Sequence, residues 1–282
     1  MPGDVEALAA RVAPSASIRT VINYGGPVEG RARFDVPDMS RTNIALVPAE
    51  VEVLDARMQP EAPSLDREGF ALIPHRSAVC HSRDMDEINR VYHEEVARLI
   101  AEVSGADLVL PQRTGLLVRR GERAKEQTWA KPARFAHLDY TRKSVDDFVG
   151  WVKEWEATDP GPYTRLVIYQ TWRATSPPPQ DNTLALCDAR TQSPGDTMVF
   201  DAVIGNTGAA GDIFESRLCL PNPNRRWLYY SNLRDDELLV FKAYDSDPQR
   251  PTDVGHTAID LPDGEQANPR ESLEARFFAF FR

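Results

Sequence analysis

The chain has 282 residues, of which 41% are hydrophobic, and a formal net charge of −10 at pH 7. This length can bury a sizeable core, whereas the acidic balance argues against non-specific nucleic-acid binding and leaves no basic patch for a membrane surface. No apolar run has bilayer-spanning length, and the stretch MPGDVEALAARVAPS lacks the charged-then-apolar order of a signal peptide. The three cysteines lie far apart, so neither a disulfide framework nor a cysteine zinc site is indicated. We therefore expect a cytoplasmic globular protein.

Residues 1–80 alternate short apolar pieces with Pro and Gly, which predicts an extension of strands and turns. A helix is expected at about 84–104, because apolar residues recur there at helical spacing. Asp84 or Asp86 can cap the start of this helix, and Gly105 can end it. A shorter helix is expected at about 144–157, with Ser144 as its N-cap.

Strand patterns dominate the rest of the chain: TGLLVRR, RFAHLDY, TRLVIYQTW, LALCDA, DTMVFDA, RWLYYSNL, ELLVFKAYD and LEARFFAFF. Turn clusters rich in Pro and Asn separate these strands, and the sequence shows no internal repeat and no Gly/Ser linker. We therefore expect a single, mainly β domain over 1–282, with its core at 81–282 and helical additions.

One strand carries two metal-binding residue types close together, in FAHLDYT. On a strand, residues i and i+2 point to the same face. His137 and Asp139 would therefore project together beside Phe135, while Leu138 and Tyr140 face the other way. The pair is either two-thirds of a metal site or an ordinary surface His–Asp pair.

A third ligand must come from elsewhere in a chain with only five histidines. His256 is the candidate, because it stands late in the chain in the apolar stretch VGHTAIDLP. A His-x-Asp pair followed much later by a lone His is the spacing of the two-His-one-carboxylate triad, which binds Fe(II) and leaves coordination positions open. By itself this spacing is a weak signal.

The segment PRESLEARFFAFFR follows His256 and places Arg270 and Ser272 on one strand face. An arginine and a hydroxyl suit a distal carboxylate, because the guanidinium donates two parallel bonds and the hydroxyl adds a third. Arg276 continues this face and is the reserve candidate. The alternative is a salt bridge from Arg270 to a neighbouring carboxylate, Glu274 or Asp260.

The sequence resembles the CmcJ/NvfI/AsaB-type oxygenases, which include gibberellin-desaturase-like and cephalosporin methoxylase-related proteins. The segments that carry the resemblance are, in order, VINYG, VEVLDAR, LDREGFALIPH, HLDYT, QTWRAT, NPNRRWLYYSNLRDDELLVFKAYDS and GHTAIDLPDGEQANPRESLEAR, and they cover nearly the whole chain. The resemblance implies a double-stranded β-helix, a jelly-roll or cupin-like barrel flanked by helices. It also implies an Fe(II)- and 2-oxoglutarate-dependent dioxygenase that uses O2 on a small molecule of secondary metabolism.

The same resemblance implies His137, Asp139 and His256 as iron ligands and Arg270 as the cosubstrate arginine, with Ser272 and Arg276 beside it. The chain departs from the family pattern in two places, with GHTAI for a PHSAF-like stretch and QTWRAT for NxWRP. The ligands and the arginine survive both changes. The second change alters residues that we expect to line the substrate pocket.

Aromatic and polar residues near these motifs are the candidates for substrate contact: Tyr140, Gln170, Trp172, Arg173, Trp227 and Tyr229. The alternative for the aromatic residues is an ordinary place in the core, and for Arg173 a surface ion pair. No catalytic acid or base beyond the metal ligands is expected, because the metal and cosubstrate supply the chemistry.

Several questions stay open at this point. Hydroxylation, desaturation, cyclisation and endoperoxide formation share the same first steps, so the sequence does not separate them. A non-oxidative isomerase or hydratase on the same barrel would use the metal as a Lewis acid, and a non-catalytic partner subunit would keep only the fold. We expect no nucleic-acid or membrane partner and leave open whether the chain forms a homodimer.

Overall fold

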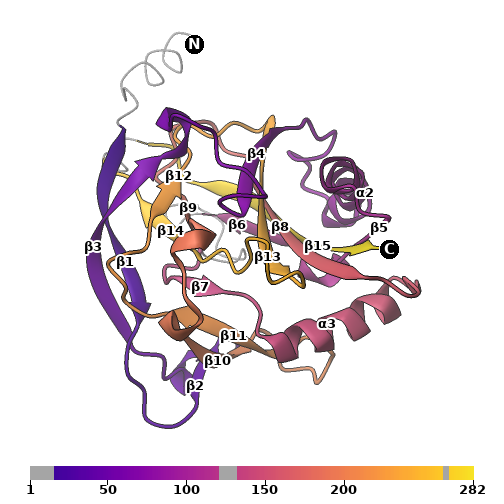
Figure 1. Ribbon diagram of the computed structural model, residues 1–282, viewed down its shortest axis with the longest axis horizontal. Coiled ribbons are helices and arrows are strands. Elements are labelled where there is room, and N and C mark those ends of the chain that lie inside the picture. The colour runs from indigo at the N-terminus through magenta and orange to yellow at the C-terminus, as the bar shows by residue number, and fades with distance from the viewer. Residues whose placement is uncertain (1–15, 121–131, 263–266) are drawn as a thin grey trace.

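The computed structural model describes residues 16–120, 132–262 and 267–282. Its strands form two curled sheets (Figure 1). The first sheet has nine strands in the order β1-β3-β12-β9-β14-β7-β11-β10-β2. The second has the order β4-β13-β8-β15-β5, and β6 also pairs with β15.

The strands of the first sheet are β1 (Ser17–Gly25), β2 (Ala32–Asp35), β3 (Leu46–Asp55), β7 (His137–Leu138), β9 (Asn182–Cys187), β10 (Thr197–Val203), β11 (Ile213–Cys219), β12 (Trp227–Tyr229) and β14 (His256–Asp260). Those of the second are β4 (Phe70–Pro74), β5 (Leu108–Pro111), β6 (Leu117–Arg120), β8 (Arg165–Ala174), β13 (Glu237–Asp245) and β15 (Glu271–Phe281). The two α-helices of the described residues are α2 (Met85–Ser104) and α3 (Arg142–Trp155).

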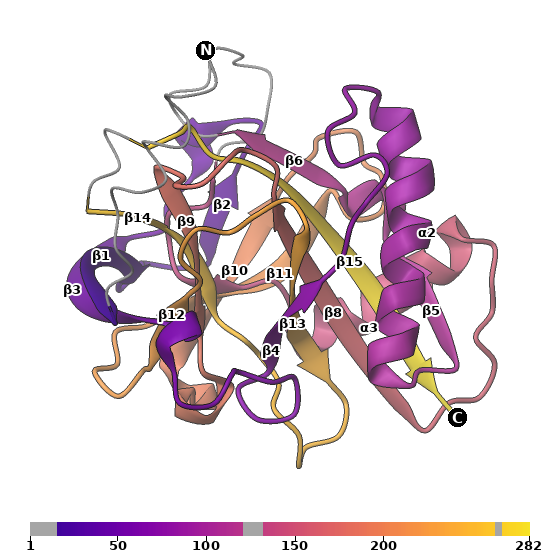
Figure 2. The same cartoon turned by 90° about the horizontal axis from the view of Figure 1, so that it is seen from above.

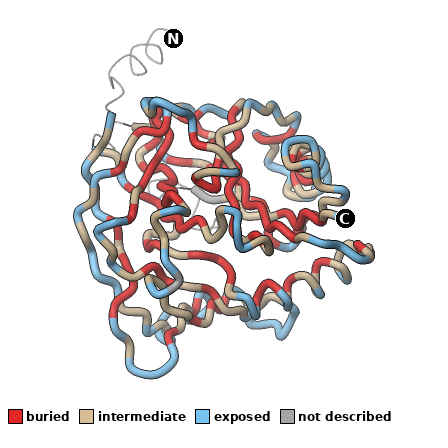
Figure 3. Tube along the Cα trace, viewed as in Figure 1, coloured by how far each residue is buried: buried red, intermediate tan, exposed pale blue. Residues whose placement is uncertain are grey.

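An apolar cluster between the two sheets holds them together. Leu184 and Leu186 of β9 reach it from the first sheet, and Trp172 of β8 and Phe241 of β13 reach it from the second. Buried residues run along the central strands of both sheets, while exposed residues concentrate in the outer connections (Figure 3). The space between the sheets is therefore a packed apolar core, and residues that line it can also form a buried functional site.

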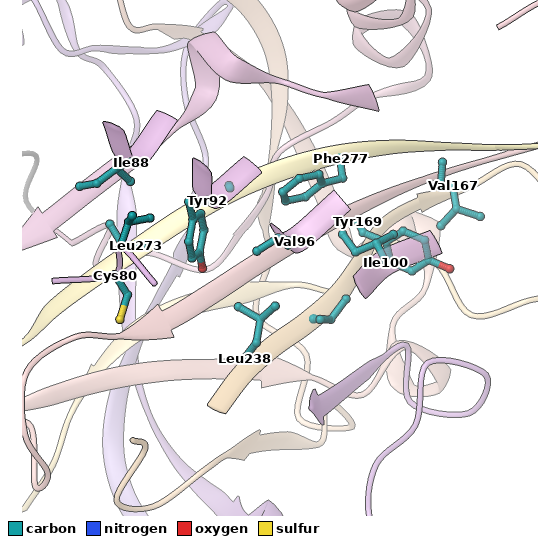
Figure 4. Close-up of a cluster of buried hydrophobic side chains, with 14 residues drawn as sticks. Cys80, Ile88, Tyr92, Val96, Ile100, Val167, Tyr169, Leu238, Leu273 and Phe277 are labelled. Atoms are coloured by element: carbon teal, nitrogen blue, oxygen red, sulfur yellow. The ribbon is translucent and has the colours of Figure 1, made fainter. Parts of the chain in front are cut away.

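Strands β8 and β15 are the longest pair, and their antiparallel register runs from Ser272 opposite Ala174 to Phe281 opposite Arg165. The apolar face of β15 lies under α2, which runs along the outside of this sheet (Figures 2 and 4). Tyr92 and Val96 of α2 pack there against Phe277. Because side chains alternate along a strand, the polar residues of β15 point toward the first sheet.

The first expected helix is confirmed as α2. Asp84 caps it, since its carboxylate accepts bonds from the backbone amides of Asp86 (2.9 Å) and Glu87 (3.2 Å). Gly105 ends it in the left-handed conformation, with a φ of +72°, which glycine adopts without strain.

The second helix, α3, is present, but the sequence placed it two residues too late in the chain. It begins at Arg142, and Thr141 is the N-cap in place of Ser144. Ser144 instead accepts a hydrogen bond from the backbone amide of Thr141 (2.8 Å), which completes a capping box. Both residues are good cap formers, so composition alone did not separate them.

A buried charge network fixes the end of β13, close to the chain segment that leads to His256. Asp245 accepts bonds from Arg165 (2.9 and 2.6 Å) and from Lys242 (3.0 Å). The Lys242 side chain is only 1% exposed. A buried ammonium needs such a partner, because removal of the carboxylate would leave its charge uncompensated.

We expect Asp245→Ala to lower the free energy of unfolding by about 3–5 kcal/mol, the usual cost of breaking a buried ion pair. Urea unfolding followed by circular dichroism measures this change. Asp236→Ala is the matched control, because Asp236 pairs with Arg234 at the surface and its loss should have a much smaller effect. Equal destabilisation by the two variants would contradict the structural role given to Asp245.

Candidate active site

The two histidines of the expected triad come from neighbouring strands. β7 and β14 pair antiparallel, and His256 lies directly opposite His137 in their register. Their ring centroids are 4.3 Å apart. Asp139 follows β7 and turns one carboxylate oxygen, Oδ1, to both rings, 3.4 Å from Nε2 of His137 and 3.8 Å from Nε2 of His256. The structure thus brings the three residues together in the interior.

Hydrogen bonds to backbone carbonyls fix the tautomer of each histidine. Nδ1 of His137 lies 2.8 Å from the carbonyl oxygen of Phe135, and Nδ1 of His256 lies 3.3 Å from that of Val254. Because a carbonyl only accepts, each Nδ1 carries the proton and each Nε2 keeps its lone pair. This is the usual arrangement of a metal-binding histidine.

The arrangement suits a divalent cation. Two lone pairs and a carboxylate oxygen converge, and ligands about 2.0–2.2 Å from one ion at right angles would lie roughly 3 Å apart. Burial lowers the pKa of His256 to about 4, so this ring is neutral and able to bind a metal at physiological pH. Burial alone would raise the pKa of Asp139, but Arg276 and the two histidines hold it well below its ordinary value.

The second oxygen of Asp139, Oδ2, has different partners. Arg276 donates to it from Nε (2.9 Å) and from Nη2 (2.6 Å). Gln170 also donates to it, from its amide Nε2. Arg276 therefore lies against the triad carboxylate, and its reserve role as an anchor for the cosubstrate stays a prediction.

Arg270 is buried deeper along the same strand face. Its guanidinium lies 4.9 Å from the ring centre of Trp172 and donates to Ser272 Oγ (3.3 and 3.1 Å). It also donates to Asn182 Oδ1 (3.2 Å) and Glu274 Oε1 (3.1 Å). The ion pair with Glu274, one of the two alternatives from the sequence, is thus present.

The other alternative partner, Asp260, accepts bonds from Arg134 at 2.9 and 2.7 Å. Asn182 and Glu274 had not been singled out as functional residues. Glu274 could have been found, because it continues the i, i+2 row of Arg270 and Ser272. Asn182 could not have been found from the sequence, because its place beside Arg270 depends on the packing of β9 against β15.

The comparisons with known proteins show the family of this chain. A family model described as an oxidoreductase/YMDC permease-like domain matches residues 22–280. The chain belongs to this family. The hydroxylase/desaturase efuI of Hormonema carpetanum is 27% identical to it, over 95% of this chain and 96% of the relative. The Fe(II)/2-oxoglutarate-dependent dioxygenase nvfI of Aspergillus novofumigatus is 26% identical, over 86% of this chain and 87% of the relative. The resemblance expected from the sequence is confirmed.

One solved structure has the same fold as this chain. The iron and alpha-ketoglutarate-dependent endoperoxidase NvfI superposes with a TM-score of 0.74 at 23% identity, over 95% of this chain and 99% of the other. The expected jelly-roll barrel is therefore confirmed. Within the part of the chain that the structure describes, no helix is both long and apolar enough to cross a bilayer.

Two of the expected substrate residues, Gln170 and Trp172, lie on the face of β8 that is directed toward the triad. This face is called the substrate wall below. Gln170 and Trp172 alternate on β8, opposite Arg276 and Glu274 of β15. Among the described residues, neither Oε1 of Gln170 nor Nε1 of Trp172 has a hydrogen-bond partner, although both atoms are buried. Buried polar atoms normally have partners, so both are candidates for contact with a bound molecule.

The structure does not bring the other four to the triad. Tyr140 packs with Phe148 under α3, because it is adjacent to Asp139 and points the opposite way. Trp227 donates to the hydroxyl of Tyr24 (2.8 Å) in a separate apolar cluster, which also contains Tyr229.

Arg173 is likewise on the far side of its sheet. It is fully buried beneath α2, where it donates to the carbonyl oxygens of His75 (2.7 Å) and Asp235 and to the hydroxyl of Tyr92 (3.3 Å). It is therefore not the surface ion pair considered from the sequence, and its observed contacts link α2 to two loops away from the triad.

A second group of metal-capable side chains, Cys80, His81 and Asp235, lies outside the barrel. His81 and Asp235 are exposed and already pair at 2.6 Å. Burial raises the pKa of the Cys80 thiol and so disfavours the thiolate that a metal would need. An exposed hydrogen-bonded pair beside a buried thiol explains this group.

We expect His137→Ala to abolish binding of Co(II), because the remaining histidine and carboxylate leave the ion too few protein ligands. Isothermal titration of metal-free protein with Co(II) measures the loss. His81→Ala is the matched control, since it removes a histidine from the other group and should leave Co(II) binding intact. Loss of binding in His81→Ala alone would place the metal outside the barrel.

Proposed function

We propose that this protein is an Fe(II)/2-oxoglutarate-dependent oxygenase that oxidises a small molecule of secondary metabolism. The observation that carries the proposal is the convergence of two Nε2 lone pairs and one carboxylate oxygen inside the barrel. Membership of an oxidoreductase family whose relatives include a hydroxylase/desaturase and an Fe(II)/2-oxoglutarate-dependent dioxygenase supports it. The comparisons favour neither a non-oxidative isomerase nor a partner subunit.

His137, Asp139 and His256 would hold Fe(II) through three ligand atoms, which leaves further positions open. When bound, Fe(II) supplies the redox chemistry by which O2 oxidises both a substrate C–H bond and 2-oxoglutarate, the latter to succinate and CO2. The protein keeps the ligands rigid and water away. Phe135 packs against the ring of His137 (5.2 Å between centroids) and Phe241 against that of His256 (5.0 Å).

Arg270 and Ser272 would bind the distal carboxylate of 2-oxoglutarate. Ser272 Oγ accepts from two nitrogens of Arg270, so its own proton is directed away from the guanidinium and can be donated to a ligand. Arg270 is 1% exposed and stacked on Trp172, which fixes the plane of its guanidinium. The cosubstrate would share this guanidinium with Glu274 or displace that carboxylate from it.

The wall of β8 would meet the organic substrate. Gln170 and Trp172 offer an acceptor and a donor there, and the leucines of β9 supply an apolar surface opposite them. Most of a small molecule's buried surface is apolar, and a few polar groups fix its orientation. This wall would therefore place one C–H bond of the substrate near the metal.

Fe(II)-loaded protein provides a direct test that needs no knowledge of the substrate. Anaerobic addition of 2-oxoglutarate should produce a metal-to-ligand charge-transfer band in the visible spectrum. Exposure to air should then convert part of the keto acid to succinate, measured by NMR, and His137→Ala should do neither. A wild-type protein that binds Fe(II) but shows neither the band nor succinate would refute the oxygenase and favour Lewis-acid chemistry.

We expect Arg270→Ala to weaken 2-oxoglutarate binding by about 100-fold or more. Loss of one partner of a buried ion pair costs about 3–5 kcal/mol, and about 1.4 kcal/mol corresponds to tenfold in affinity. Titration of the charge-transfer band measures the effect. Ser272→Ala should lose only about one hydrogen bond, roughly 1 kcal/mol or several-fold in affinity.

The affinity for Fe(II) should be largely unchanged in both variants, because neither residue contacts the triad. An Arg270→Ala protein that binds 2-oxoglutarate as well as wild type does would move the carboxylate site to another cation.

A further inference from the structure

The two oxygens of Asp139 face different surroundings. Oδ1 is directed to the Nε2 atoms of His137 and His256. Oδ2 accepts three hydrogen bonds, from Nε and Nη2 of Arg276 and from Nε2 of Gln170. Three donors saturate the lone pairs of this oxygen, whereas Oδ1 remains available.

The donors are themselves held in place. Arg276 and Gln170 stand directly opposite each other in the register of β15 and β8. Nη1 of Arg276 donates to the carbonyl oxygen of Gly115 (3.1 Å), which orients the far side of the guanidinium. Gln170 is 3% exposed, so it has little freedom to turn away.

We infer that Arg276 and Gln170 are positioning residues that fix Asp139 as a one-oxygen metal ligand, an inference that rests on the proposed function. A carboxylate bound through both oxygens would take up an additional coordination position. The proposed reaction needs the open positions for the keto acid and O2. The hydrogen bonds to Oδ2 leave only Oδ1 available to the metal, so Asp139 occupies a single coordination position. They also set the direction of Oδ1. Bonds of this kind, made to a ligand rather than to the metal, typically change metal affinity 10–100-fold.

Charge and geometry must be separated in the test, because removal of a guanidinium near a dication would by itself favour metal binding. Arg276→Lys keeps the charge and loses the planar fork. Gln170→Leu keeps neutrality and volume and loses the amide donor. Arg173→Lys is the matched control, since Arg173 is a buried arginine on the other face of the sheet.

Three measurements are made on each protein: Co(II) affinity by isothermal titration, the visible spectrum of the Co(II) form, and 2-oxoglutarate affinity at saturating Fe(II). We expect Arg276→Lys and Gln170→Leu to weaken Co(II) binding by roughly 10–100-fold and to alter the Co(II) spectrum. At saturating Fe(II), 2-oxoglutarate affinity should stay close to that of wild type. Arg173→Lys should leave all three measurements at their wild-type values.

Unchanged Co(II) affinity and spectrum in both site variants would overturn the inference and leave the proposed function intact. A loss of 2-oxoglutarate affinity in Arg276→Lys, with Co(II) binding unchanged, would also overturn it and assign Arg276 to the cosubstrate. Absence of Co(II) binding in wild type would remove the proposed metal site, and the inference with it.

Discussion

The ion pair between Asp139 and Arg276 is the interaction on which the interior depends, because it joins the two sheets at the site. Asp139 follows β7 of the nine-stranded sheet, and Arg276 belongs to β15 of the other. Asp139 is buried and the Arg276 side chain is only 16% exposed, so loss of either would leave a largely uncompensated charge in a medium of low polarity. The ion pair therefore favours the packing of the two sheets that brings these side chains together. The same closure brings the triad and the polar face of β15 into one space.

Charges in that space alternate in sign along β15. Arg270, Glu274 and Arg276 point inward from one face, and with Asp139 their formal charges cancel. The proposed ligands, a dication and a dianionic keto acid, also cancel each other when they are bound together. Either ligand alone would leave the interior two charges out of balance, and unbalanced buried charge is costly. The arrangement thus favours joint occupation by metal and cosubstrate.

Features that depend on neighbours along the chain were predictable. The apolar stripe and the capping residues located the helix that ends at Gly105, and strand alternation put His137 and Asp139 on one face. The pairing of β14 with β7 is a long-range contact, so His256 was only a candidate until the register was known. Strands β5, β11 and β14 were missed. β5 is short and ends in proline, while polar residues interrupt the apolar pattern of β11, IFESRLC.

Gln170 contacts the proposed metal ligand Asp139 and also lies on the proposed substrate wall. It stands where the family pattern NxWRP has asparagine, a change that the sequence suggested would affect the substrate pocket. The glutamine side chain is longer by one methylene, and its amide nitrogen reaches the carboxylate of Asp139. The amide oxygen is left buried and, among the described residues, unpartnered on the proposed substrate wall. One residue thus contacts a proposed metal ligand through its donor while it offers its acceptor to the substrate. A substitution at this position would change substrate recognition and the orientation of Asp139 together, because both depend on the rotation of one amide group.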